Sequence, residues 1–120
     1  MSKISLCPAS PNCVCTLENE TAKKRMPTLR YVGEIQTARQ RMKDLVLALG
    51  NAKLQEEAEN YLHFTFKTRL GGFIDDVEFE FAEREKVIHF RSASRVGYSD
   101  MGANKRRMRK ISRLWSTIGR

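Results

Sequence analysis

The sequence predicts an α+β fold of two layers, in which an antiparallel sheet of about four strands is covered on one face by an N-terminal and a C-terminal helix. Two changes of pattern lead to this expectation. Apolar residues recur with the helical period over residues 34–49 and 102–118, whereas between residues 51 and 92 the period is two. A chain of 120 residues has room for one core. We therefore expect an extended, proline-containing arm over residues 1–33 and a single α+β domain over residues 34–120.

Each predicted helix carries one apolar face. The first helix has apolar residues at spacings of three and four, namely Ile35, Ala38, Met42, Leu45 and Leu49. Gly50 follows at the place where helices commonly end through a left-handed residue. In the last helix the corresponding stripe consists of Met108, Ile111, Trp115 and Ile118. These stripes predict which side chains each helix packs on the sheet.

Four segments with period two predict the strands. A weak strand at residues 52–57 precedes stronger ones at residues 60–67, 76–82 and 86–92. If the last two connections are two-residue turns centred on Gly71-Gly72 and Arg84-Glu85, the apolar side chains of neighbouring strands lie opposite one another. In that register Phe64 faces Phe79 and Phe79 faces Phe90. The three stronger strands should therefore form a meander with one aromatic face covered by the helices.

The same register predicts a polar opposite face. It places Lys67 beside Asp76, Thr65 beside Glu78, His63 beside Glu80, Glu78 beside Arg91, and Glu80 beside His89. Two histidines and a carboxylate in one row, His63, Glu80 and His89, would suit zinc or iron. Such pairs are also ordinary chemistry on exposed strands. We favour the second interpretation and expect no cofactor.

The net charge of +8 is concentrated in the last helix. Of the 22 basic and 14 acidic residues, seven basic and no acidic residues lie in residues 103–120. The basic residues Lys105, Arg106, Arg107, Arg109, Lys110 and Arg113 are candidates for contact with nucleic-acid phosphates or an anionic membrane surface. However, the core needs the apolar stripe of this helix, and no aromatic residue is interleaved to stack on bases. A solvated or charge-paired face is therefore the favoured interpretation.

The sequence also indicates where the protein resides. Its composition, 41% hydrophobic and 30% charged, is typical of a soluble globular protein. No apolar run approaches the roughly 20 residues of a membrane span. The first residues lack the apolar core of a secretory signal. We expect a cytoplasmic protein without a membrane span.

A stretch rich in arginine and serine joins the last strand to the last helix. Its ligand-binding candidates are Arg91, Ser92, Ser94, Arg95, Tyr98, Ser99, Asp100 and Asn104. Together with the free amides of a helix beginning near Gly102, they could bind a phosphate or carboxylate. Alternatively, Asp100 caps that helix while Arg91 pairs with Glu78 and Arg95 pairs with Asp75 or Asp76. We favour the alternative, a buried network of ion pairs and caps.

An acidic cluster is the second candidate site. Asp75, Asp76, Glu78 and Asp100 could bind Mg²⁺ or Ca²⁺ through oxygen, or shift one another's pKa for acid–base chemistry. Successive residues of a strand point to opposite faces, so Asp75 and Asp76 should diverge. With Lys67 and Arg91 nearby, salt bridges are the simpler interpretation.

Three motifs together resemble a known family. They are "CPASPNC" at residues 7–13, "GFIDDVEFEF" at residues 72–81 and "RSASRVGYSDMGANKRR" at residues 91–107. The chain is similar, over nearly its whole length, to the domain of unknown function 1499 family of small bacterial and plastid proteins. The resemblance implies no activity. It places Cys15 where relatives carry a serine, so no essential family role is expected of this residue.

The spacing C-x5-C-x-C of Cys7, Cys13 and Cys15 lacks the repeated pairs of a zinc site. Relatives of the family often carry an export signal or membrane anchor, and in an exported relative Cys7 and Cys13 could form a disulfide. In a reducing cytoplasm they should stay thiols that anchor the arm.

No catalytic triad order, phosphate-binding glycine loop or zinc signature is present in the sequence. We therefore expect a non-enzymatic binding or interaction module whose functional surface is the Arg/Ser loop with the acidic hairpin. Its partner would be a small anionic or polar ligand, or another protein. One alternative is a metal-dependent or acid–base hydrolase that uses five groups around one cleft: Asp76, Glu78, Arg91, Arg95 and Asp100. The other is nucleic-acid binding through the basic helix.

Overall fold

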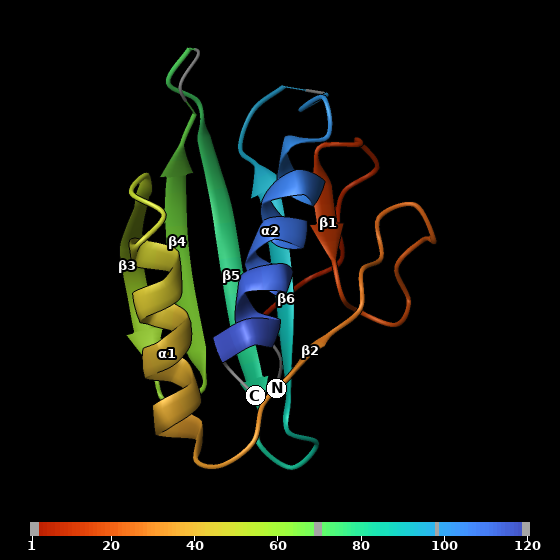
Figure 1. Ribbon diagram of the computed structural model, residues 1–120. Helices are drawn as coiled ribbons and strands as arrows, with labels where there is room; N and C mark the ends of the chain where they lie inside the picture. Colours follow the sequence, from red (N-terminus) through yellow and green to blue (C-terminus); the bar gives the residue numbers. More distant parts are fainter. Residues whose placement is uncertain (1–2, 69–70, 98, 119–120) are drawn as a thin grey trace.

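The computed structural model describes residues 3–68, 71–97 and 99–118, and its fold is α+β as predicted. In order along the chain the elements are β1 (Cys13–Cys15), β2 (Leu29–Arg30), α1 (Ile35–Leu47), β3 (Ala52–Ala58), β4 (Tyr61–Lys67), β5 (Ile74–Ala82), β6 (Val87–Ser94) and α2 (Ala103–Ile118). The antiparallel sheet has the strand order β1-β6-β5-β4-β3, and β2 also pairs with β6. Both helices lie on the same face of the sheet (Figure 1).

The sheet contains six strands, against about four expected, because the N-terminal arm adds β1 and β2. Val14 of β1 pairs with Ser92 of β6, and Leu29 of β2 pairs with Ile88 near the start of the same strand. Strands of three and two residues are too short to show a period of two. The arm therefore lacks the sequence pattern on which a strand prediction depends.

The predicted register is right for one hairpin and wrong for the other. Phe79 lies opposite Phe90 in the β5–β6 pair, as expected from a turn at Arg84-Glu85. In the β4–β5 pair, Phe64 lies opposite Val77 instead of Phe79. The reason is that Gly71-Gly72 is not a two-residue turn. The strands stop pairing at Lys67 and Ile74, which leaves six residues in the connection.

Because the register differs by two residues and not one, every side chain keeps its predicted face. The neighbours across the β4–β5 pair change, however. His63 lies opposite Glu78 instead of Glu80, and Lys67 lies opposite Ile74 instead of Asp76. Thr65 lies opposite Asp76. The predicted row of His63, Glu80 and His89 is therefore not formed, although Glu80 does lie opposite His89.

The core lies between the sheet and the two helices. It contains the aromatic side chains that β4, β5 and β6 turn toward the helices, namely Phe64, Phe66, Phe79, Phe81 and Phe90. From α2 it contains Met108, Ile111 and Trp115, whose indole N–H donates to the carbonyl of Arg30 at 2.8 Å. Ile118, predicted to belong to the same stripe, is half exposed because it is the last residue of the helix.

The first helix is followed by the predicted glycine but ends at Leu47, two residues before its predicted end at Leu49. α1 stops at Leu47, and Gly50 follows with a positive φ of 91°. That conformation favours glycine, because a side chain there would clash with the backbone. In the described part of the chain, neither helix has both the length and the apolar composition needed to span a bilayer.

Candidate functional site

Strands β5 and β6 carry parts of two of the sequence motifs, those at residues 72–81 and 91–107. The side chains of these motifs are distributed over both faces of the sheet. Asp75 lies opposite Ser94 in the ladder, and these side chains point toward α2. Asp76 and Glu78 lie opposite Ala93 and Arg91, with their side chains on the outer face. Residues that are adjacent in the motifs therefore belong to two separate clusters, because successive strand residues alternate in direction.

The first cluster, which we call the inner polar network, lies beneath the N-terminal end of α2. It consists of Asn12, Asp75, Ser92, Ser94, Asp100, Asn104 and Arg107. The Arg107 guanidinium donates from Nη2 to Asp75 Oδ2 at 2.7 Å. From Nη1 it donates to Asn104 Oδ1 at 2.7 Å and to Ser92 Oγ at 3.2 Å. Asp75 is only 1% exposed, so this is a buried ion pair. The sequence offered Asp75 or Asp76 as the partner of Arg95; Arg95 pairs with Asp76, and the partner of Asp75 is Arg107.

Asp100 caps the start of α2, as predicted. Its Oδ1 accepts the N–H of Gly102 at 2.8 Å, and its Oδ2 accepts the N–H of Asn104 at 2.9 Å. Burial raises the pKa of Asp100, but these hydrogen bonds to the ionised form outweigh burial and the pKa is lowered. Two amides that could have bound an anion are thus satisfied by the protein itself.

Asn12 of the arm also belongs to the network, although it was not predicted as a site residue. Its Nδ2 donates to the carbonyl of Gly97 at 2.7 Å. Its backbone carbonyl accepts the N–H of Ser94 at 3.0 Å and Nδ2–H of Asn104 at 3.1 Å. The one available signal was its place in the "CPASPNC" motif. The inner polar network therefore joins the arm, β5, β6 and α2.

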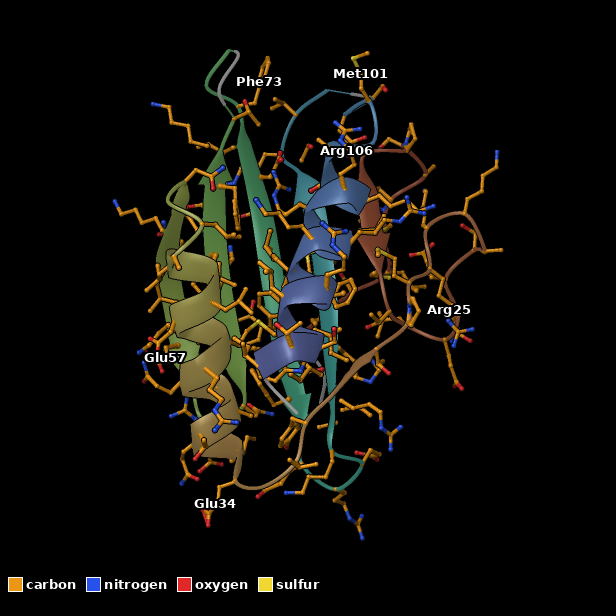
Figure 2. The ribbon with its side chains drawn as sticks, in the orientation of Figure 1. Arg25, Glu34, Glu57, Phe73, Met101 and Arg106 are labelled. Atoms are coloured by element: carbon orange, nitrogen blue, oxygen red, sulfur yellow. A yellow bond between two sulfur atoms is a disulfide. The ribbon has the colours of Figure 1, made fainter. Side chains whose placement is uncertain are left out.

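A cleft of about 640 Å³, which we call the basic cleft, opens beside this network. It is lined by residues 49–51 after α1, by Phe66 of β4, and by Ala103, Arg106, Arg107 and Lys110 of α2. Arg106 and Lys110 are exposed, and Figure 2 shows Arg106 on the first turn of α2. The Arg107 guanidinium lies 4.6 Å from the centroid of the Phe66 ring. No acidic side chain lines the cleft among residues 3–68, 71–97 and 99–118.

Arg107 connects the cleft with the network. A guanidinium has five N–H donors, and three of these are used by Asp75, Asn104 and Ser92. The two others have no acceptor within the described part of the chain. A cationic side chain that is fixed by neighbours and still has donors to offer is suited to binding carboxylate or phosphate oxygens.

The second cluster, which we call the polar sheet face, lies on the opposite side of the sheet. It consists of Tyr61, His63, Asp76, Glu78, Arg91 and Arg95. Asp76 accepts from Arg95 at 2.8 and 2.9 Å and contacts His63 Nε2 at 2.8 Å. The Arg95 guanidinium lowers the pKa of Asp76, and Asp76 in turn raises the pKa of Arg95. Since the Arg95 side chain is 52% exposed, this pair is a surface interaction.

Glu78 is the centre of the other half of this face. It accepts the Tyr61 hydroxyl at 2.5 Å and lies 3.8 Å from Arg91 Nη1. Burial, with the neighbouring Glu78 carboxylate, strongly raises the pKa of Tyr61. The predicted pairing of Arg91 with Glu78 is present, although Arg91 Nε is buried without an acceptor in the described residues.

The five groups of the predicted hydrolase cleft are not brought together. Asp76, Glu78, Arg91 and Arg95 lie on the polar sheet face, whereas Asp100 lies at the start of α2 and bonds to Asn104 of the inner polar network. Of the remaining ligand candidates, Ser99 Oγ accepts the N–H of Met101 at 3.2 Å. Tyr98 lies outside the described residues.

The basic residues of α2 do not form a single stripe for nucleic acid. Arg107 is turned inward to Asp75, while Arg106 and Lys110 line the basic cleft. Arg109 and Arg113 line a different hollow together with residues 26–29 of the arm. Lys105 lines a third hollow that also contains Asp100. The predicted positive patch is thus divided among several surfaces.

Cys13 and Cys15 belong to β1, and their side chains point to the face opposite that of the core residue Val14. Cys7 and Cys13, whose pairing the sequence left open, form a disulfide, and Cys15 is a buried free thiol. Ligand atoms of Cys7, Cys15 and Glu20 lie within 4.8 Å of one another. This is the one cluster of three or more cysteine, histidine or acidic ligands with metal-binding spacing in the described part of the chain.

Both clusters and the cleft fall within a region shared with other proteins. Residues 3–114 match the family described as "Protein of unknown function (DUF1499)". The chain belongs to this family. Comparison with curated proteins and with solved structures returned no match. Membership of DUF1499 thus confirms the resemblance seen in the sequence, and the chemistry of the site must be argued from its own residues.

Proposed function

We propose that this DUF1499 chain is a non-enzymatic binding module, and that it holds a small anionic ligand in the basic cleft. The observation that carries the proposal is the lining of this cleft. Two exposed cations, Arg106 and Lys110, stand beside the partly used guanidinium of Arg107, and no described acid lines the same space.

The dimensions and surface of the cleft support a small molecule. Its volume of about 640 Å³ lies within the range of about 300–1,000 Å³ common for ligand pockets. The Phe66 ring and Leu49 offer apolar surface, while the cations offer charge-assisted hydrogen bonds. A compact molecule with a carboxylate or phosphate group and an apolar part would match both features.

The Arg/Ser motif and the acidic hairpin take part in this proposal as supports of Arg107. Asp75 of the hairpin accepts from Nη2 of its guanidinium, while Ser92 of the motif and Asn104 both accept from Nη1. A donor that is already ordered loses little conformational entropy when a ligand binds. On this proposal the functional surface lies on the helix side of the sheet, and the motif residues on the polar sheet face do not contribute to it.

The test is isothermal titration calorimetry with three probes: inorganic phosphate, succinate and adenosine monophosphate. The cleft variant is Arg106→Ala/Lys110→Ala. Its matched control, Arg109→Ala/Arg113→Ala, removes the same charge from the same helix outside the cleft. We expect at least one probe to bind, with affinity reduced by at least about tenfold in the cleft variant and little changed in the control.

Two results would contradict the proposal. The first is that none of the three probes binds to the wild-type protein. The second is that both double variants weaken binding equally, because the effect would then come from overall charge. Binding of a random DNA duplex that falls steeply with salt and depends on all four residues would instead favour a nucleic-acid surface.

A further inference from the structure

Three cysteines and one glutamate converge beside β1. Cys13 and Cys15 are two residues apart on the strand, so their side chains share one face. The disulfide brings Cys7 to Cys13, and Cys7 Sγ also lies within 4.8 Å of Cys15 Sγ and a Glu20 oxygen. The spacing C-x5-C-x-C had lacked a fourth ligand in the sequence, and the fold supplies one in Glu20.

The Glu20 carboxylate is held facing the sulfur atoms. Its Oε1 accepts the N–H of Cys7 at 2.7 Å and lies 3.3 Å from Cys15 Sγ. Its Oε2 accepts the N–H of Thr21 at 3.1 Å. Glu20 is therefore an oxygen ligand already in position beside the sulfur atoms.

We propose that opening of the Cys7–Cys13 disulfide creates a site for Zn²⁺ or a similar thiolate-binding cation, with the sulfur atoms of Cys7, Cys13 and Cys15 and a carboxylate oxygen of Glu20 as its four ligands. A dithiol reductant supplies two electrons and two protons, breaks the S–S bond and becomes a disulfide itself. The cation then displaces the protons of the three thiols. While the disulfide is closed, only Cys15 and Glu20 remain as ligands, so the cation binds only to the reduced form.

The spacing and composition of the group fit this chemistry. Zn²⁺ takes four ligands in a tetrahedron, with Zn–S near 2.3 Å and Zn–O near 2.0 to 2.2 Å, which places the ligand atoms roughly 3.5 to 4 Å apart. Ligand atoms of Cys7, Cys15 and Glu20 already lie within 4.8 Å of one another, and the disulfide holds Cys13 Sγ beside Cys7 Sγ. Once the disulfide opens, rotation of the Cys7 and Cys13 side chains brings the four ligands to that arrangement. The positive charge of Lys24, which interacts with the Glu20 carboxylate, would offset part of the negative charge of a thiolate-rich site.

The sulfur atoms differ in their exposure to solvent. Cys15 is a buried free thiol. Cys13 is fully buried, whereas Cys7 is partly exposed. A reductant therefore reaches the disulfide at Cys7.

The test is a titration with Co²⁺, which reports thiolate ligation through charge-transfer absorption and tetrahedral geometry through its visible bands. The full chain is titrated as the disulfide form and after reduction with a phosphine. We expect both kinds of band in the reduced protein and neither in the oxidised protein, with Zn²⁺ displacing Co²⁺ and bleaching the spectrum.

Two variants separate a built site from loose thiols. Glu20→Gln keeps all three cysteines, and Cys15→Ser keeps the pair that forms the disulfide. We expect each to weaken Co²⁺ binding by at least about tenfold, while Glu18→Gln, an exposed neighbouring change of the same kind, leaves it unaltered. Absence of the bands in the reduced wild-type protein overturns the proposal. If the reduced wild-type protein, Glu20→Gln and Cys15→Ser bind Co²⁺ with equal affinity, the proposal is overturned as well.

Discussion

The inner polar network and the polar sheet face both contain alternate residues of β5 and β6, yet their surroundings differ. The inner network is covered by α2 and joined to the arm through Asn12. The polar sheet face is covered in part by Lys3, whose backbone N–H donates to Glu80 and whose Nζ lies 4.4 Å from the centroid of the Tyr61 ring. The Asp75 side chain is 2% exposed, whereas the side chain of its neighbour Asp76 is 23% exposed.

This difference in cover decides what each charge does. A buried carboxylate such as Asp75 has lost its hydration, so removal of its partner Arg107 would leave an uncompensated buried charge and destabilise the fold strongly. A partly exposed carboxylate such as Asp76 keeps contact with water, and its pair with Arg95 contributes little to stability. Adjacent aspartates in one motif therefore have different roles. The inner one holds Arg107 in place, and the outer one belongs to a surface of weak ion pairs.

The strongest way to break the inner network is to remove the cation and leave the acid. Arg107→Met should lower the free energy of unfolding by about 3 kcal/mol, because the Asp75 carboxylate stays buried without a partner for its charge. Denaturation in urea, followed by circular dichroism, measures this loss.

Replacing both members of the pair supplies the control. Asp75→Leu/Arg107→Met should recover most of the stability lost in Arg107→Met, because no buried charge remains. Ser92 Oγ and Asn104 Oδ1 still bond to each other at 2.6 Å, so they are not left without partners. A double variant as unstable as Arg107→Met alone would show that burial of the charge is not the cause.

A smaller effect is expected at the end of the network that caps α2. Asp100→Ala should lower the free energy of unfolding by about 1 kcal/mol, since it removes the acceptor for the amides of Gly102 and Asn104. Ser99→Ala is a suitable control, because Ser99 accepts one exposed N–H from Met101. If both changes lower stability equally in urea denaturation, Asp100 does not act as a cap.

The Asp76 carboxylate on the polar sheet face should make the free energy of unfolding depend on pH. The pKa of Asp76 is lower in the folded chain than its ordinary value of about 3.9. The ionised carboxylate therefore stabilises the fold above the unfolded pKa, and this contribution is lost as pH falls through the folded pKa. Between about pH 6 and about pH 3, Asp76→Asn should lose less stability than the wild-type protein. Parallel pH profiles for the two proteins would contradict this assignment.

Much of the fold follows from local pattern, and the limits of that prediction have physical causes. Periods of 3.6 and two locate both helices and four strands, and the short turn near Arg84 fixes the β5–β6 register. The β4–β5 register was wrong because the glycines of its connection suggested a tighter turn than the six residues that form it. The predicted assignment of side chains to the two faces of the sheet was still right, because a register shift of two residues leaves each side chain on the same face.

The candidate site was less predictable because its parts come from distant segments. Arg107 belongs to a basic helix, and nothing local distinguishes it from Arg106, which faces the cleft instead of Asp75. The β4–β5 register places Asp75 opposite Phe66, inside an otherwise aromatic face, where a charge interrupts the apolar pattern. Glu20 lies near the cysteines because of the way the arm folds. The arm has no periodic pattern of apolar residues from which that fold could be predicted.

The most direct measurement compares Asp75→Asn with Asp76→Asn in urea denaturation at neutral pH. The two variants make the same chemical change at adjacent positions on opposite faces of β5. We predict that Asp75→Asn loses about 3 kcal/mol of stability, because it removes the anion that pairs with the partly buried Arg107. We predict a much smaller loss for Asp76→Asn, because its partner Arg95 is exposed. Equal losses in the two variants, or a greater loss in Asp76→Asn, would contradict the division of this motif into a buried network and a surface.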